Sequence, residues 1–184
     1  MHLLLDRLPS PVGTILLVCD GDALHALDFG DDEERLRRLL DRRYSDYRLA
    51  SGRPPAAIRA AINGYFEGEF EPLNRLPVET GGTLFQRLVW SALREIPAGT
   101  TVTYGQLAGR IGRPLGSRAV GMANGSNPVA IVVPCHRVIG ANGALTGYGG
   151  GLDRKRWLLA HERALPAELF PPGTIPRHFP VPPG

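Results

Sequence analysis

A cysteine, a histidine and an arginine stand side by side at residues 135–137, directly after an apolar run that ends in proline. Cysteine reacts as its thiolate, and cationic neighbours favour that form. A buried cysteine is more often a small apolar filler of a core than a reagent. Because Pro134 precedes it, Cys135 is expected at the end of a strand, not within one. The segment therefore leaves two alternatives, an inert core residue or a nucleophile.

A nucleophilic Cys135 needs a base and a third group that orients the base. His136 is the nearest imidazole, but adjacent residues of an extended chain point to opposite faces, so contact requires a bend or a bridging water. Glu162 is the best carboxylate for fixing the imidazole tautomer, because the second half of the chain has few acids. The same residue types also fit an unrelated cysteine hydrolase, although no oxyanion-hole signature is evident.

The other cysteine, Cys19, offers a metal site as an alternative. His25 follows it six residues later and His2 precedes it, but no C-x-x-C or comparable ligand pairing is present. We therefore predict no metal and no cofactor. Since the two cysteines lie far apart in dissimilar contexts, both are expected to be reduced thiols.

Charge is divided unevenly along the chain. Residues 1–79 carry ten arginines and fourteen acids, a net charge of −4, whereas residues 80–184 carry ten arginines, one lysine and four acids, a net charge of +7. Chance and solvated helix faces are one explanation. The sharper interpretation is a C-terminal half that meets a polyanion, to whose phosphates arginine makes bidentate contacts.

Length and composition are those of a globular protein. With 184 residues, 43% of them hydrophobic, the chain can form one ordinary domain or two small ones. It contains no run of 18 apolar residues, and its first residues resemble no secretory leader. We expect a cytoplasmic protein.

In the first half, strand-like stretches separated by turn residues predict a small sheet, and the helical spacing of apolar residues after them predicts helices. Strands are expected at 2–7, 13–19 and 23–29, helices at 31–43 and 56–70, and a linker at 71–82.

Helical spacing dominates the second half. We expect helices at 83–96 and 103–112, the latter with a Thr103–Gln106 capping box, and then a third helix with Pro114 at its first position and Gly125 as its C-cap. These last two helices form a helix-turn-helix pattern. A buried strand at 130–134, a glycine-rich loop at 140–151, a helix capped by Asp153 and a proline-rich tail at 166–184 complete the expectation.

The third of these helices is rich in small residues. Gly116, Ser117, Ala119, Gly121 and Ala123 surround one long cationic side chain, Arg118. Small residues allow close approach, either to the protein's own core or to a nucleic-acid backbone. The pattern alone leaves both alternatives open.

Three segments together resemble the O6-alkylguanine-DNA alkyltransferases, the methylated-DNA–protein-cysteine methyltransferases. They are "SRAVGMANGSNP", "VPCHRVIG" and "LTGYGGGLDRKRWLLAHE", and the match extends from about Thr83 to Glu162. The N-terminal half is similar in layout, with "PSPVGTILL" typical of the family. The resemblance implies direct DNA repair, in which Cys135 irreversibly takes the alkyl group from O6-alkylguanine, or from O4-alkylthymine, in a single turnover with base flipping. The alternative is a non-catalytic relative that binds alkylated DNA and flags it for other repair.

The resemblance also implies residue roles. His136 would take the thiol proton through a water, Glu162 would orient His136, and Tyr104 would donate a hydrogen bond to the departing guanine. Arg118 would fill the place of the extruded base, while Ser117, Ala119 and Gly121 would press on the DNA minor groove. Asn127 would tie the helices to the active-site segment. The pocket would be lined by Val138, Tyr148, Gly149 and Gly150, and the backbone carbonyls of Cys135 and Val138 would accept from the guanine amine.

The implied fold is a two-domain α/β protein. A ribonuclease-H-like domain of a small sheet and helices would span 1–79, and a mainly helical, winged-helix-like domain would span 80–165 before the tail. Double-stranded DNA is the expected partner, bound with little sequence preference by a monomer that could assemble cooperatively. No cysteine or histidine occurs near Arg75, where some members hold zinc, and the glycines at 149–151 imply a roomy pocket.

Overall fold

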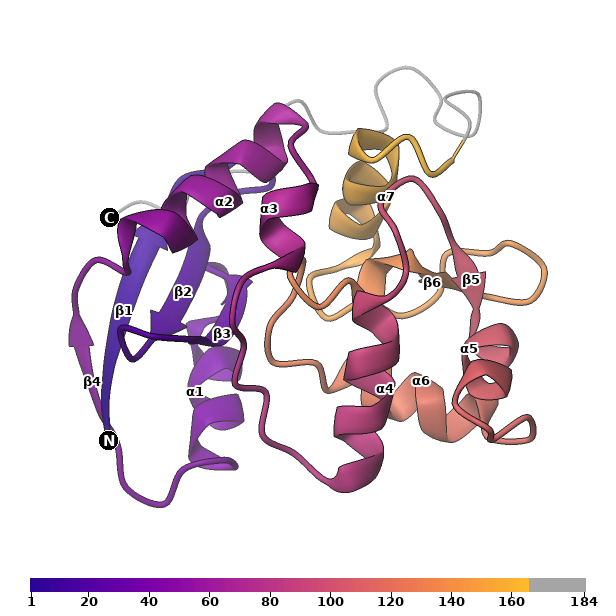
Figure 1. Ribbon diagram of the computed structural model, residues 1–184, viewed down its shortest axis with the longest axis horizontal. Helices are drawn as coiled ribbons and strands as arrows, with labels where there is room; N and C mark the ends of the chain where they lie inside the picture. Colours follow the sequence, from indigo (N-terminus) through magenta and orange to yellow (C-terminus); the bar gives the residue numbers. More distant parts are fainter. Residues whose placement is uncertain (166–184) are drawn as a thin grey trace. The chain divides into compact units, whose positions relative to one another are not determined.

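The computed structural model describes residues 1–165, so the tail at 166–184 lies outside the described residues (Figure 1). The described chain forms two compact units, residues 1–81 with 128–132, and residues 82–127 with 133–165. The segment 128–132 belongs to the first unit because Leu27 donates its N–H to the Pro128 carbonyl at 3.0 Å and accepts from Ala130 N–H at 2.9 Å. A single boundary near residue 80 therefore differs from the observed division, in which the chain returns once to the first unit.

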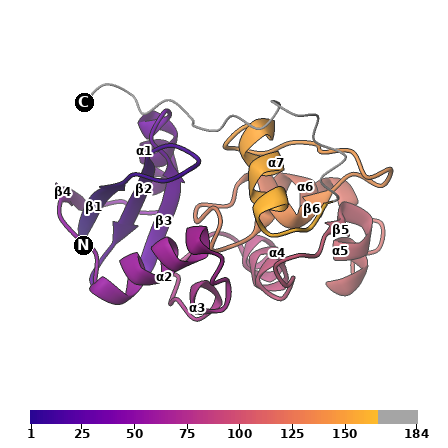
Figure 2. The same cartoon turned by 90° about the horizontal axis from the view of Figure 1, so that it is seen from above.

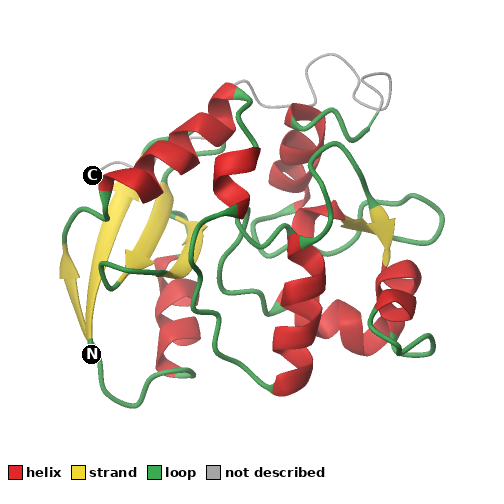
Figure 3. Ribbon diagram, viewed as in Figure 1, coloured by secondary structure: helices red, strands yellow, loops and turns green. Residues whose placement is uncertain are grey.

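A four-stranded sheet forms the centre of the first unit (Figure 3). Its strands are β1 (His2–Leu8), β2 (Ile15–Cys19), β3 (Leu24–Phe29) and β4 (Arg48–Ser51), in the order β3-β2-β1-β4. β1 is antiparallel to β2 and parallel to β4. The three expected strands are confirmed. The sequence pattern missed β4, because its four residues are mostly exposed and show no apolar alternation.

Helices cover both faces of this sheet (Figure 2). On one face, Leu36 and Leu40 of α1 (Glu33–Asp41) pack with Leu3, Leu5, Leu16, Val18 and Ala26. Asp6 points to the other face by strand alternation, and there it pairs with Arg59 of α2 (Ala56–Glu67). A short helix, α3 (Glu71–Asn74), lies within the expected linker.

The second unit is mainly helical. It contains α4 (Leu84–Arg94), α5 (Tyr104–Arg110), α6 (Ser117–Gly125), α7 (Leu152–His161), the 3-10 turn η1 (Cys135–Arg137) and two short parallel strands, β5 (Val102–Thr103) and β6 (Val138–Ile139). The capping box of Thr103 and Gln106 is confirmed, and Thr83 and Gln86 form a second one at α4. This agrees with the expected helix-turn-helix domain. In residues 1–165, no helix is long and apolar enough to cross a membrane.

Three local expectations for the second half are wrong. Residues 130–134 form turns and not a strand, because Ile131 adopts a positive φ of 68° that interrupts an extended chain. α6 begins at Ser117 after the N-cap Gly116, so Pro114 lies in the preceding turn, and Ser126 is its C-cap in place of Gly125. α7 has Gly151 as its N-cap, with Asp153 inside the first turn. Turns that end at Gly116 and Gly151 set the starts of α6 and α7.

Candidate active site and nucleic-acid interface

Cys135 is the first residue of η1, and it is buried with 6% of its surface exposed. The turn supplies the bend that an extended Cys-His pair would lack. Asn127, just after α6, donates from Nδ2 to the Val133 carbonyl at 2.7 Å and to Cys135 Sγ at 3.1 Å. An N–H donor directed at sulfur stabilises the thiolate more than the neutral thiol. The end of α6 thus holds the nucleophile in place.

His136 is fully buried and is oriented by Glu162. Its Nε2 lies 2.8 Å from Glu162 Oε1. Burial lowers the pKa of His136 and outweighs the opposite effect of the carboxylate, so the ring is neutral at neutral pH. A neutral ring that donates from Nε2 to a carboxylate keeps its lone pair on Nδ1. Nδ1 is buried and has no hydrogen-bond partner in the described part of the chain. In this tautomer Nδ1 is able to accept a proton.

Arg137 fixes the carboxylate that orients His136. Its Nε donates to Glu162 Oε2 at 2.8 Å, its Nη2 donates to Oε1 at 2.9 Å, and its Nη1 donates to the Ile96 carbonyl. Burial alone would raise the pKa of Glu162, but His136 and the guanidinium of Arg137 hold it well below its ordinary value. Glu162 is therefore an anion with both oxygens engaged, and the imidazole tautomer follows from it.

Tyr104 opens α5 and reaches the glycine-rich loop. Its hydroxyl donates to the Thr146 carbonyl at 3.4 Å, a long hydrogen bond. Burial raises the pKa of Tyr104 above its ordinary value, so the phenol keeps its proton and acts as a donor.

Lys155 of α7 ties the same loop to the strand after the nucleophile. Its Nζ is buried and donates to the carbonyls of Val138 at 2.6 Å, Thr146 at 2.8 Å and Gly147 at 3.4 Å. Burial lowers the pKa of Lys155 to about 8. Three rotatable N–H donors on a compact ammonium suit three converging carbonyls.

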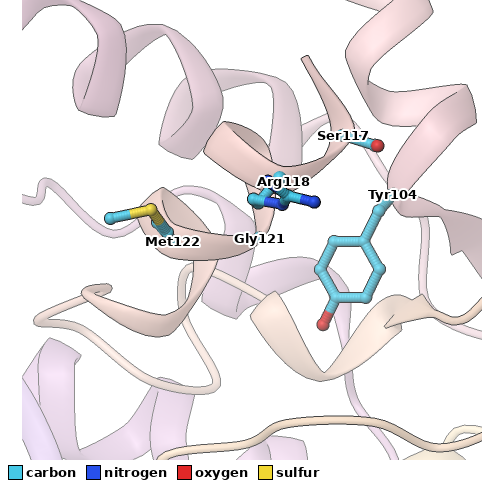
Figure 4. Close-up of a pocket in the computed structure, with 5 residues that line it drawn as sticks. All are labelled: Tyr104, Ser117, Arg118, Gly121 and Met122. Atoms are coloured by element: carbon cyan, nitrogen blue, oxygen red, sulfur yellow. The ribbon is translucent and has the colours of Figure 1, made fainter. Parts of the chain in front are cut away.

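The surface of α5 and α6 is open and cationic. A hollow of about 460 Å³ is lined by Tyr104, Ser117, Arg118, Gly121 and Met122 (Figure 4). A Cβ on Gly121 would stand 3.7 Å from the Tyr104 ring, which is ordinary contact, so glycine here leaves the hollow open without relieving a clash. Arg118 is exposed and makes no ion pair within residues 1–165. The sequence has no Asp or Glu between Glu95 and Asp153.

Comparisons with known proteins match both units. Residues 84–164 match the family described as "6-O-methylguanine DNA methyltransferase, DNA binding domain", and residues 5–80 match its "ribonuclease-like domain". The chain belongs to the O6-alkylguanine-DNA alkyltransferase family.

Two relatives and one solved structure illustrate the similarity to this family. A "Methylated-DNA--protein-cysteine methyltransferase" of Shigella flexneri is 47% identical over 165 residues, which cover 88% of this chain and 96% of the relative. One from Mycolicibacterium paratuberculosis is 52% identical over 157 residues, covering 84% and 88%. The crystal structure of Mycobacterium tuberculosis OGT in complex with DNA has a TM-score of 0.74 and 41% identity, covering 92% of this chain and 98% of that one.

The structure brings together most of the residues that the sequence selected for this alkyltransferase. Cys135, His136 and Glu162 share one buried region with Asn127, as described above. The ring of Tyr148 packs edge-on to His136, with centroids 6.5 Å apart. On the outer side, Ser117 and Ala119 of α6 are exposed, as is Gly149, while the carbonyl of Gly150 accepts from Arg154 at 3.2 Å.

The Val138 carbonyl has a different environment from the one expected. It already accepts from Lys155 Nζ, and the Cys135 carbonyl accepts from Asn124 Nδ2 at 3.4 Å. The Cys135 carbonyl also accepts from the Val138 N–H, so both of its lone pairs are engaged within the protein.

Sequence reasoning missed two residues that organise this alkyltransferase site. From the sequence, Arg137 was interpreted only as a cation next to Cys135 and His136. In the structure it donates two hydrogen bonds to the Glu162 carboxylate. Lys155 received no role, yet it carried a signal because it is the one lysine among 21 basic residues. A chain that otherwise uses arginine keeps lysine where a compact, three-way donor is needed.

The metal alternative finds no support in the arrangement of side chains. Within residues 1–165, no three His, Cys, Asp or Glu side chains are placed to share an ion. His25 instead lies 2.5 Å from the Tyr44 hydroxyl through Nδ1 and 2.9 Å from Asp20 through Nε2.

Proposed function

We propose that Cys135 receives the alkyl group from O6-alkylguanine in DNA, which is the repair reaction of this family. The thiolate sulfur attacks the alkyl carbon in line, so the S–C bond forms as the bond from carbon to O6 breaks. The thiol proton passes to His136 Nδ1 through a water, and Tyr104 donates a hydrogen bond to the guanine ring as it leaves. The observation that carries this proposal is the buried chain of contacts from Asn127 through Cys135 and from His136 to Glu162 and Arg137.

Each molecule acts once. The product is a thioether, and a thioether sulfur cannot return to a thiolate without a nucleophile that removes its alkyl group. The alkylated base itself supplies the group that is transferred, so the reaction needs no cofactor. The same displacement applies to O4-alkylthymine, whose alkyl group is also bonded to a ring-carbonyl oxygen. The protein works in the cytoplasm, where thiols remain reduced.

The damaged base must leave the duplex to meet a buried sulfur. Flipping a base costs a few kcal/mol, least for a damaged or mispaired one. Arg118 takes the space left in the base stack, while the small side chains of Ser117, Ala119 and Gly121 let α6 lie against the minor groove with little sequence readout. A monomer is sufficient for this reaction, and cooperative assembly on DNA is compatible with it.

The non-catalytic alternative is not favoured. Relatives that only flag lesions carry another residue in place of the reactive cysteine, whereas this chain has Cys135 with a base and an orienting carboxylate.

The test is mass spectrometry after incubation with a duplex oligonucleotide that contains O6-methylguanine. The tryptic peptide 119–137, which contains Cys135, is expected to gain one methyl group per molecule of protein. The peptide 8–35, which contains Cys19, is the internal control and should stay unmodified. A protein that turns over many lesions, or that gains no methyl group, would contradict the proposal.

Replacing Arg118 by alanine should impair repair of duplex DNA by about 10- to 100-fold, and reaction with free O6-benzylguanine much less. The reason is that Arg118 stabilises the duplex after the base has left, a role that a free base does not require. Single-turnover rates on the two substrates measure the effect. Equal losses on both would show that Arg118 acts on the active site itself.

A further inference from the structure

Two exposed apolar side chains lie close to Arg118 in the sequence, one three residues before it and one four residues after it. Leu115, in the turn before α6, is completely exposed, and Met122 on α6 is 74% exposed. Met122 follows Arg118 by four residues, so the two project from the same face of the helix. Figure 4 shows Met122 on one side of Arg118 and Tyr104 on the other. Single exposed apolar residues are common, but Met122 lines the same hollow as Arg118, the residue proposed above to fill the gap in the DNA stack.

The charge around this pair restricts what it can bind. Arg110 and Arg113 are exposed and precede Leu115 by five and two residues, and like Arg118 they form no ion pair in the part of the chain that the structure describes. With no acid anywhere in residues 96–152, nothing on these helices offsets the three cations. Such a surface attracts a polyanion and repels a second copy of itself. The occupant that the charge favours is DNA.

We propose that Met122 and Leu115 are apolar DNA contacts that cover the base step opened next to the extruded nucleotide. This inference rests on the proposed function. Minor-groove proteins that open a base step commonly insert apolar side chains there, Leu and Met among them. Met122 forms one edge of the hollow beside Arg118, where it covers base and sugar surfaces that flipping exposes. The flexible thioether adapts to any base, in keeping with weak sequence readout.

The contact has a property that distinguishes it from a phosphate contact. An apolar contact releases no counterions, so its loss weakens binding without changing the dependence of affinity on salt. Loss of one phosphate contact reduces the slope of log Kd against log salt by about one. Met122→Gln keeps the length of the side chain and removes its apolar end.

The experiment measures the affinity for duplex DNA containing O6-methylguanine over a series of salt concentrations. Met122→Gln, Met122→Ala and Leu115→Ala are each expected to weaken binding by roughly three- to tenfold, with the wild-type salt slope. Leu88→Ala is the matched control, because Leu88 is also exposed (45%) but lies on α4. It should bind as the wild type does.

Three outcomes would overturn the inference. One is wild-type affinity in the Met122 and Leu115 variants, and a second is an equal loss in Leu88→Ala. The third is a wild-type dimer in sedimentation that these variants abolish, which would make the surface an interface between copies. Methylation of Cys135 in the wild type and in every variant would show that the proposed function holds whichever result is obtained.

Discussion

Replacing Glu162 by glutamine is expected to slow alkyl transfer by about 10²- to 10³-fold at neutral pH. The amide can donate to His136 Nε2, which moves the imidazole proton to Nδ1 and removes the lone pair that takes the thiol proton. Single-turnover rates with free O6-benzylguanine measure this loss without contributions from DNA binding. Glu95→Gln, which changes an exposed carboxylate of the same unit, is the control and should react at the wild-type rate.

The pH dependence separates this effect from a damaged fold. As the pH rises, a growing fraction of Cys135 ionises without help from His136, so the gap between Glu162→Gln and the wild type should narrow. A gap that stays constant across the alkaline range would contradict the role of Glu162 in orienting the base.

Stability should change in the same variant, because Arg137 keeps its buried charge and loses its counterion. The expected cost is about 3–5 kcal/mol at neutral pH. The pKa of Glu162 is lower in the folded than in the unfolded protein, so the unfolded chain binds more protons as the pH falls through about 4.5. The wild type should therefore lose stability there, whereas Glu162→Gln should lack this contribution. Denaturant unfolding at neutral and acid pH compares the two.

The parts of the fold that sequence could predict are those set by local chemistry. The capping box at Thr103 fixed the start of α5, and apolar spacing located α4. The prediction of a strand at 130–134 was wrong because the apolar residues of this segment are buried in turns. A short apolar run without a period of two or 3.6 residues does not distinguish a buried strand from a buried turn. The turn at Ile131 depends on a positive φ, which the residue type does not predict.

The candidate site shows the same limit. The types and order of Cys135, His136 and Glu162 suggested a nucleophile, a base and its orienting group before any coordinates. Which nitrogen of His136 faces the carboxylate, and that Arg137 holds both carboxylate oxygens, depend on side-chain directions set by η1 and α7. Lys155 donates only to backbone carbonyls, which every residue has. The sequence therefore does not show which residues Lys155 contacts.

Replacing Lys155 by methionine should slow alkyl transfer by about 10²-fold at neutral pH and weaken the binding of free O6-benzylguanine. Methionine has similar length but donates nothing, so the carbonyls of Val138, Thr146 and Gly147 lose their common donor. Thr146 also accepts from Tyr104, so release of the loop disturbs both the loop itself and the Tyr104 hydroxyl, the proposed donor to guanine. Rates at several substrate concentrations separate the loss of binding from the loss of reactivity.

Part of this effect comes from the charge of Lys155, and pH reveals that part. In the folded protein Lys155 loses its proton near pH 8, well below the ordinary value of 10.5. Its positive charge near Cys135, which favours the thiolate, is therefore present below that pH and lost above it. The wild-type advantage over Lys155→Met should shrink as the pH rises through about 8, and a remainder should persist because the neutral amine still donates hydrogen bonds. Arg156→Met removes a charge from the neighbouring position of α7, where Arg156 pairs with Asp153. This control should change neither the rate of alkyl transfer nor the binding of free O6-benzylguanine. If the rate advantage of the wild type over Lys155→Met does not vary with pH, Lys155 acts only by holding the loop and its charge has no effect on Cys135. If Arg156→Met slows alkyl transfer as much as Lys155→Met does, Lys155 has no positioning role.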